Sequence, residues 1–198
     1  MGVYSLNQLF TWVDAAYGVQ PDLKRHNGSG MLFGYGMVHC NYIKQKLNTK
    51  SSTESKLVGI SDYLPYNIWT CLFMGAQGYS IKQNILFQDN QSEINVEKNR
   101  NKSCTGNYRH IDIHYLFVKD RVESNSISIT YCSTDHMISD FFTKSLQGDI
   151  FVKFWKVIMG CKHVDNLQMG PPPTKEHVVN VVKVESSKVE VESSVEIK

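Results

Sequence analysis

Hydrophobic residues in the first quarter of the chain come in three short runs, at 12–17, 31–35 and 38–43. The first run alternates around an aspartate, and a polar loop at 20–27 separates it from the second run. We interpret the glycines beside these runs as turn residues: Gly28, Gly30, Gly34 and Gly36. Short apolar-rich runs joined by glycine turns predict an antiparallel meander of three strands.

Apolar residues then recur every three or four positions, as on one face of a helix: Leu57, Ile60, Leu64, Ile68 and Leu72. Ser51 and Glu54 stand at the start of this pattern with the S-x-x-E spacing of a capping box. Gly75 and Gly78 follow the last apolar position, and glycine commonly marks the end of a helix. The pattern therefore predicts a long helix that begins near Ser51 and ends near one of these two glycines.

The rest of the chain alternates between predicted strands and helices. Residues 85–89 form a nearly continuous apolar run that ends in an aspartate, as a buried central strand would, and 127–131 alternate as another strand. Helical periods are expected at 91–98, 110–122 and 137–159. The order β-β-β-α-β-α-α-β-α predicts an α/β (α+β) fold with a mixed five-stranded sheet flanked by helices, in which the 85–89 strand lies parallel to the first strand.

Composition excludes several classes of protein. With 21 Lys and Arg against 19 Asp and Glu, the net charge is only +2, so nucleic-acid contact has to come from local clusters of basic residues. No run approaches the 18 or more apolar residues of a membrane span, and the first residues do not resemble a signal peptide, so we expect an intracellular protein in the cytoplasm or nucleus. The five cysteines are widely spaced, which argues against a zinc ribbon or a disulfide framework.

The end of the chain differs in composition from the rest. Beyond the Gly-Pro-Pro-Pro sequence at 170–173, valine, glutamate, lysine and serine dominate, and no aromatic residue occurs. We therefore expect a Pro-rich linker and a disordered tail at 161–198, a folded domain at 12–160 and a remnant of a preceding region at 1–11.

Four carboxylates lie at the ends of the predicted elements: Asp14, Glu54, Asp89 and Asp140. If the strands that carry Asp14 and Asp89 are neighbours, the two carboxylates repel each other unless a cation lies between them. A cluster of hard oxygen ligands suits Mg²⁺ or Mn²⁺, and a two-ion site of this kind catalyses in-line attack of water on a phosphodiester.

Each of these carboxylates also has a purely structural interpretation. Glu54 could simply complete its capping box, Asp89 could open a turn through Asn90, and Asp140 could be a solvated residue of the last helix. The pattern of residues leaves both interpretations open.

Five segments, in order, resemble a known family: VDA at 13–15, KQKLNTKSSTE at 44–54, QDNQS at 88–92, RHIDI at 109–113 and SDFFTK at 139–144. They are similar to the ribonuclease H domain at the C-terminal end of copia-type retrotransposon polyproteins. The similarity covers about residues 12–155. It implies a ribonuclease-H-like fold and a substrate, the RNA strand of an RNA/DNA hybrid, that is cleaved during reverse transcription to leave a 3′-hydroxyl and a 5′-phosphate.

The resemblance also implies roles for the four carboxylates. The family binds two Mg²⁺ or Mn²⁺ ions, and Asp14 would bridge the two ions. Glu54 and Asp89 would hold the ion that prepares the attacking water, and Asp140 would complete the ion at the leaving 3′ oxygen. The implied partners are the hybrid and the reverse transcriptase domain of the parent polyprotein.

Further residues are candidates for substrate contact. Polar groups that could recognise 2′-hydroxyls stand near the acidic residues: Ser51, Ser52 and Gln91. Basic residues that could follow the phosphate backbone precede two of the predicted helices: Lys44, Lys46, Lys50 and Arg109. His136, four residues before Asp140, is a candidate for proton transfer. The alternative interpretation is that these residues simply belong to an ordinary solvated surface.

Only 13 residues precede Asp14, where the family has a long reverse transcriptase, and this keeps a second hypothesis open. Two further departures from the family pattern concern helix packing near the site and remove no ligand. Ser145 replaces the proline that usually follows Thr-Lys, and Glu93 replaces the usual small residue after Asn-Gln-Ser. The alternative is a catalytically weak or inactive remnant that acts at most as a nucleic-acid or protein binding module. An integrase-like transferase fits less well, because Glu54 lies between the first two aspartates and not after them.

Overall fold

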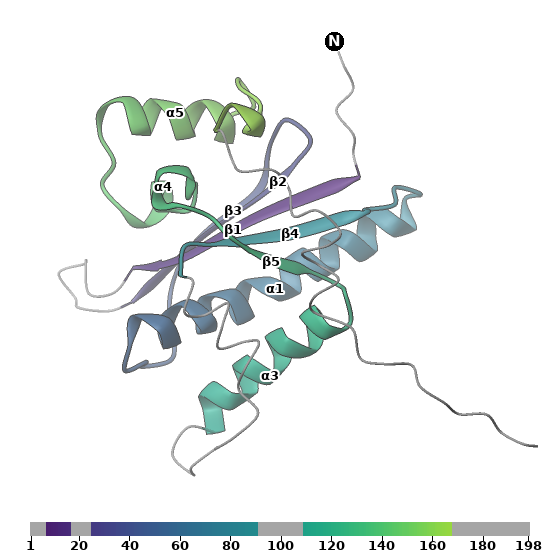
Figure 1. Ribbon diagram of the computed structural model, residues 1–198, viewed down its shortest axis with the longest axis vertical. Helices are drawn as coiled ribbons and strands as arrows, with labels where there is room; N and C mark the ends of the chain where they lie inside the picture. Colours follow the sequence, from purple (N-terminus) through teal and green to yellow (C-terminus); the bar gives the residue numbers. More distant parts are fainter. Residues whose placement is uncertain (1–6, 17–24, 91–108, 168–198) are drawn as a thin grey trace, which may run out of the picture.

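The computed structural model describes residues 7–16, 25–90 and 109–167, and these form a five-stranded sheet with helices on both faces (Figure 1). The strand order is β3-β2-β1-β4-β5. Helices α1 and α3 lie against one face, and α4 and α5 lie against the other. The predicted fold class, an α/β (α+β) fold with a mixed five-stranded sheet flanked by helices, is confirmed.

The first three strands form the antiparallel meander that the apolar runs predict. They are β1 (Gln8–Ala16), β2 (His26–Phe33) and β3 (Gly36–Lys44). The turn between β2 and β3 contains Gly34, whose φ of 73° suits glycine.

Two glycines that we interpret from sequence as turn residues lie elsewhere. Gly28 and Gly30 are inside β2, where each pairs with a residue of β1. The turn interpretation is therefore wrong for both. A glycine inside a strand often marks a place where other atoms approach the backbone closely, and this is the case here.

The last two strands run parallel to β1. Strand β4 (Gln83–Gln88) pairs with β1, and β5 (Ser128–Tyr131) pairs with β4. The predicted parallel arrangement of the first strand and the 85–89 strand is confirmed. Because both faces of β1 and β4 are covered by helices, these strands are apolar along most of their length.

Helix α1 (Ser52–Ala76) begins and ends where the sequence predicts. The Ser51 hydroxyl accepts a hydrogen bond from the Glu54 N–H at 3.1 Å, which satisfies one free donor of the first turn. The predicted apolar face is buried as far as Leu64, but Leu72 is 69% exposed. The C-terminal part of α1 therefore extends past the sheet core.

Helix α3 (Arg109–Glu123) confirms the helical period predicted for 110–122. It packs beside α1, and Ile111, Tyr115 and Val118 join the core between these helices and the sheet. The helix predicted at 91–98 lies outside the described residues.

The single helix predicted at 137–159 is wrong. The chain forms a short 3-10 helix η1 (Thr134–His136), then α4 (Asp140–Thr143) and α5 (Gly148–Ile158). Gly148 has a φ of 64°, a left-handed conformation that no continuous α-helix can pass through. The amphipathic period runs across this break because α4 and α5 both pack on the same face of the sheet.

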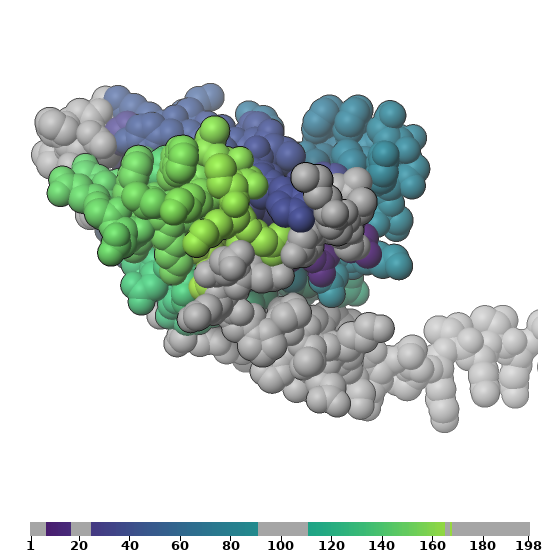
Figure 2. Space-filling model, turned by 90° about the horizontal axis from the view of Figure 1, so that it is seen from above, coloured from purple at the N-terminus to yellow at the C-terminus, as the bar shows by residue number. Residues whose placement is uncertain are grey.

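A second core lies between this face and the helices that cover it. Trp12 stacks on Phe87 with ring centroids 5.1 Å apart, and Phe154 of α5 is fully buried in the same cluster. Val164 and Leu167, at the two ends of η2 (Val164–Leu167), are buried there too. Figure 2, which looks onto α5, shows the segment from α5 to η2 as a continuous layer over this side of the molecule.

The domain boundaries predicted at residues 11 and 160 remain predictions, and everything beyond residue 167 lies outside the described part of the chain. Four cysteines within the described ranges are free thiols: Cys40, Cys71, Cys132 and Cys161. Among the helices that the structure describes, none is both long and apolar enough to cross a membrane.

Candidate functional site

Asp14 and Asp89 meet at one edge of the sheet because their strands are adjacent and parallel. Trp12 of β1 pairs with Phe87 of β4, and each aspartate follows two residues after its member of this pair. The two carboxylates therefore lie at the same level and on the same side of the sheet. Asp14 is only 2% exposed.

Asp140 joins them from the other side of the edge, as the first residue of α4. It is also only 2% exposed, and it lies close enough to Asp14 and Asp89 for their charges to raise its pKa. The last residue of α4 binds directly to β1, because the Thr143 hydroxyl donates a hydrogen bond of 2.7 Å to Asp14 Oδ2. The structure thus brings three of the four predicted carboxylates into one cluster, which we call the aspartate cluster (Asp14, Asp89 and Asp140).

The close approach of α4 depends on Gly28, which pairs with Asp14 across β1 and β2. A Cβ atom at Gly28 would lie 2.5 Å from Thr143 Cγ2 and 3.0 Å from the Ser139 carbonyl oxygen. The bare backbone therefore leaves the room that α4 needs to reach Asp14. Sequence reasoning missed both Gly28 and Thr143, although a glycine inside a strand pattern is a known signal of close backbone approach.

Two lysines neutralise part of the aspartate cluster. Lys56, from the second turn of α1, forms ion pairs with Asp89 Oδ1 and with Asp14 Oδ1, the latter at 3.4 Å. Lys144, after α4, pairs with Asp140 Oδ2 at 2.7 Å. The Lys56 side chain is 13% exposed and that of Lys144 is 42% exposed, so Lys56 is the more deeply held of the two. Sequence analysis did not select either lysine.

Asp140 retains one oxygen that nothing in the described part of the chain satisfies. Its Oδ1 atom is buried and has no hydrogen-bond partner there, and the same holds for the neighbouring Ser139 Oγ and for Gln88 Nε2. Burial raises the pKa of Asp140 to about 6, the hydrogen bond from Lys144 opposes this, and the charges of Asp14 and Asp89 add to the rise. A buried, poorly satisfied carboxylate of this kind is typical of functional sites.

Glu54 has a different environment. Its carboxylate accepts a hydrogen bond of 2.6 Å from the Lys50 N–H, and its own N–H binds Ser51 Oγ. These contacts support the capping interpretation. Within the described residues, no group of three or more His, Cys, Asp or Glu side chains is arranged so that it could hold a metal ion.

The predicted contact residues on the α1 side form one exposed surface. Lys44, Lys46, Lys50, Ser51 and Ser52 are all exposed and line the segment that leads into α1. This segment is held in place by a buried residue, Gln45, whose amide donates to Asn27 Oδ1 at 2.5 Å and to the Ser55 carbonyl at 2.6 Å.

Other predicted residues are not placed at the cluster. Gln91 and the side chain of Arg109 lie outside the described part of the structure. His136 is half-buried, and its Nδ1 lies 2.9 Å from Ser133 Oγ. Burial lowers the pKa of His136 and the charge of Lys153 lowers it further, against an opposing effect of Asp135.

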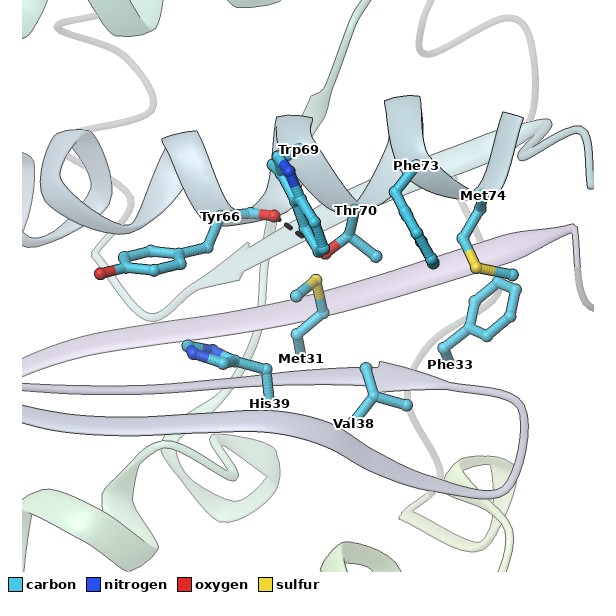
Figure 3. Close-up of a pocket in the computed structure, with 9 residues that line it drawn as sticks. All are labelled: Met31, Phe33, Val38, His39, Tyr66, Trp69, Thr70, Phe73 and Met74. Carbon is cyan, nitrogen blue, oxygen red and sulfur yellow. Dashed lines mark hydrogen bonds between the residues drawn. The ribbon is translucent and has the colours of Figure 1, made fainter. Parts of the chain in front are cut away.

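An apolar groove of about 270 Å³ lies away from these acids (Figure 3). Tyr66, Trp69 and Phe73 of α1 form one wall, and Phe33 and Val38 of the β2–β3 hairpin form the other. None of the aspartates lines it, so this groove is separate from the candidate site.

The sequences to which this chain is similar include Pol and Gag-Pol polyproteins of transposons. It is 26% identical over 129 residues to the retrovirus-related Pol polyprotein from transposon TNT 1-94 of Nicotiana tabacum, a match that covers 64% of this chain. It is 28% identical over 141 residues to the transposon Ty1-JR1 Gag-Pol polyprotein of Saccharomyces cerevisiae, covering 71% of this chain. The matches span only 10% and 8% of these relatives.

Solved structures with some likeness include two ribonucleases H. LC11-RNase H1 in complex with RNA/DNA hybrid gives a TM-score of 0.47 at 8% identity, covering 66% of this chain and 88% of that one. The N-terminal RNase H domain of a Mycobacterium tuberculosis protein gives 0.44 at 10% identity, covering 75% and 96%. Likeness at this level assigns no residue or activity to the chain. No protein-family model matches it.

Proposed function

We propose that this chain is a metal-dependent ribonuclease H that hydrolyses the RNA strand of RNA/DNA hybrids during the reverse transcription of a retrotransposon. The observation that carries the proposal is the convergence of Asp14, Asp89 and Asp140 at one sheet edge. The sequence relatives, which are transposon polyproteins, support the same assignment.

The chemistry of the three aspartates suits a divalent cation, although their side chains would have to rearrange to hold one. All the ligands on offer are carboxylate oxygens, which Mg²⁺ and Mn²⁺ prefer. The buried Oδ1 of Asp140, unsatisfied within the described chain, is the kind of group that a cation would complete. Asp14, Asp89 and Asp140 would hold the ions, and Glu54 would join them by giving up its hydrogen bond to the Lys50 N–H.

Bound Mg²⁺ or Mn²⁺ ions would supply an activated water and would stabilise negative charge on the leaving 3′ oxygen. The chain itself orients the ligands. Thr143 fixes the Asp14 carboxylate through its hydroxyl, and the hydrogen bond from the Asp89 N–H to Gln88 Oε1 fixes the backbone where Asp89 leaves the sheet. His136 is proposed to take part in proton transfer, for which its lowered pKa favours the neutral, proton-accepting form.

The exposed surface before α1 is proposed to bind the hybrid. Lys44, Lys46 and Lys50 would follow the phosphates, and Ser51 and Ser52 would contact 2′-hydroxyls in the shallow minor groove. Gln91 and Arg109 are proposed to contact the hybrid as well, on the basis of the sequence alone. The chain is further proposed to work inside the cell as part of a longer polyprotein, next to a reverse transcriptase domain.

A labelled RNA/DNA hybrid tests the activity directly. The purified chain with Mg²⁺ or Mn²⁺ is expected to cut the RNA strand, leaving 3′-hydroxyl and 5′-phosphate ends, and to spare a DNA duplex of the same sequence. Asp89→Asn is expected to abolish cleavage. Cleavage that survives both chelation of the metal and Asp89→Asn would overturn the proposed site.

One observation favours the alternative, a module that binds without catalysis. Lys56 already neutralises part of the charge of Asp14 and Asp89, which reduces the attraction of the site for added cations. If the chain binds the hybrid and Mn²⁺ but does not cut, the non-catalytic module becomes the better description.

A further inference from the structure

The charge balance of the aspartate cluster is unusual for a site proposed to bind divalent cations. Among the described residues, three carboxylates face two ammonium groups, and these five groups together carry a net charge of −1. The affinity of carboxylate sites for divalent cations rises with the number of uncompensated negative charges. Either lysine therefore lowers the attraction of the cluster for Mg²⁺ or Mn²⁺.

Lys56 has the larger effect of the two lysines because of its position. Its side chain is 13% exposed, as enclosed as that of Asp89 at 14%, and it contacts both Asp14 and Asp89. Lys144 contacts only Asp140, from a more exposed position. Asp14 Oδ2 already accepts the hydrogen bond from Thr143, so Oδ1, which the Lys56 ammonium contacts, is the Asp14 oxygen that an ion shared with Asp89 would meet. Two cations at these oxygens repel each other, so each weakens the binding of the other.

We propose that Lys56 is an internal counter-cation that competes with a divalent metal ion for Asp14 and Asp89. It keeps the cluster neutral enough to fold without metal, and it must withdraw when an ion binds. The lysine side chain suits this task, since a compact ammonium on a flexible four-carbon stem can swing into solvent. This inference rests on the proposed metal site and assigns to that site a residue that tunes its affinity.

The competition predicts two opposite effects of one substitution. Lys56→Met keeps the volume of the stem and removes the charge. Divalent cations are then expected to bind more tightly, by on the order of tenfold, because the ion no longer displaces an ammonium group. Without metal the variant is expected to unfold at a lower temperature than the natural chain, because two adjacent carboxylates lose their shared counter-ion.

Two variants serve as controls. Lys119→Met removes one positive charge from α3, where Lys119 pairs with Glu123 at the surface, and is expected to change neither measurement. Lys56→Arg keeps the positive charge and is expected not to tighten metal binding. A gain with Lys56→Met that is absent in both controls identifies a local effect of the charge at position 56.

The measurements are calorimetric titration with Mn²⁺ and Mg²⁺ and thermal unfolding with and without metal. Should Lys56→Met be unfolded without metal and fold when Mn²⁺ is added, the inference is supported in its strongest form. If Lys56→Met binds Mn²⁺ no more tightly than the natural chain while Asp14→Asn abolishes binding, the metal site stands and the competition is refuted. If neither the natural chain nor Lys56→Met binds a divalent cation, the metal site and the competition both fail.

Discussion

Asp140 shows most clearly how burial sets the chemistry of a single residue in this domain. Its carboxylate is almost fully enclosed, has one oxygen paired with Lys144, and has a second oxygen unsatisfied within the described chain. Enclosure penalises the charged form, and the nearby charges of Asp14 and Asp89 penalise it again. The hydrogen bond from Lys144 only partly offsets these costs. The pKa is therefore raised from its usual value to about 6.

This raised pKa predicts an unusual dependence of stability on pH. Between about pH 4 and pH 6 the folded state holds a proton at Asp140 that the unfolded state has released. The contribution of Asp140 to stability is therefore present at pH 4 and is lost as the pH rises to 6. Urea unfolding of the metal-free chain at several pH values measures this effect.

Asp140→Asn isolates that contribution from those of other carboxylates. The difference in unfolding free energy between the natural chain and Asp140→Asn is expected to change between pH 4 and pH 6 and to level off above pH 7. A difference that stays constant from pH 4 to pH 7 would show that Asp140 titrates normally in the folded chain.

The sequence predicted the types of the site residues better than their contacts. Asp14 and Asp89 were selected because an aspartate after an apolar strand needs a partner, and parallel pairing then places the two together. Lys56 gave no such signal, because a lysine near the start of a helix looks the same whether it points to solvent or to a carboxylate. Its role depends on the exact rotation of α1 against the sheet, which a hydrophobic period fixes only roughly.

At the scale of elements, the site depends on how closely α4 approaches β2. A four-residue helix has little stability of its own, so its place is set by packing. Phe141 packs into the second core, and Thr143 reaches Asp14. Gly28 leaves the space that Thr143 and the Ser139 carbonyl require.

Gly28→Ala tests this dependence. The new methyl group would overlap Thr143 and crowd the Ser139 carbonyl, so α4 has to move and its hydrogen bond to Asp14 lengthens. We expect a loss of about 1–3 kcal/mol in unfolding free energy, as for other overpacked cores. Urea unfolding measures the change.

Gly75→Ala is the matched control for this substitution. Gly75 lies in the last turn of α1 with nothing within 4 Å of an added Cβ, so alanine should stabilise the helix by about 0.5–1 kcal/mol. Equal effects of the two substitutions would mean that α4 does not rely on the bare backbone at Gly28.

The elements themselves were largely predictable, and the main exception is the single helix predicted at 137–159. The meander, α1, α3 and the parallel strands follow from local periodicity and caps. The break between α4 and α5 does not, because it depends on the left-handed conformation of one glycine, Gly148, inside a continuous apolar period. Helix α1 was predicted although it contains Pro65, and the structure continues through this residue, where proline usually ends a helix.

At the scale of the whole molecule, charge is arranged locally and not in bulk. The net charge of +2 gives no general attraction to nucleic acid, whereas the exposed lysines before α1 adjoin the N-terminus of that helix. Binding of the hybrid should then depend on a few identifiable contacts. Each contact to a phosphate releases bound counter-ions, so the dependence of affinity on salt counts these contacts.

Lys46→Ala is expected to weaken binding of an RNA/DNA hybrid equally for all sequences, because a phosphate contact carries no base information. A plot of log affinity against log salt concentration should become shallower by about 0.9 for one lost phosphate contact, the value known for B-form DNA. Fluorescence anisotropy in metal-free buffer measures both quantities without cleavage. Lys119→Ala, which removes an equal charge from α3, should leave the slope unchanged. If the two variants shift the slope alike, the hybrid responds to the overall charge of the domain, and the surface before α1 is not its binding site.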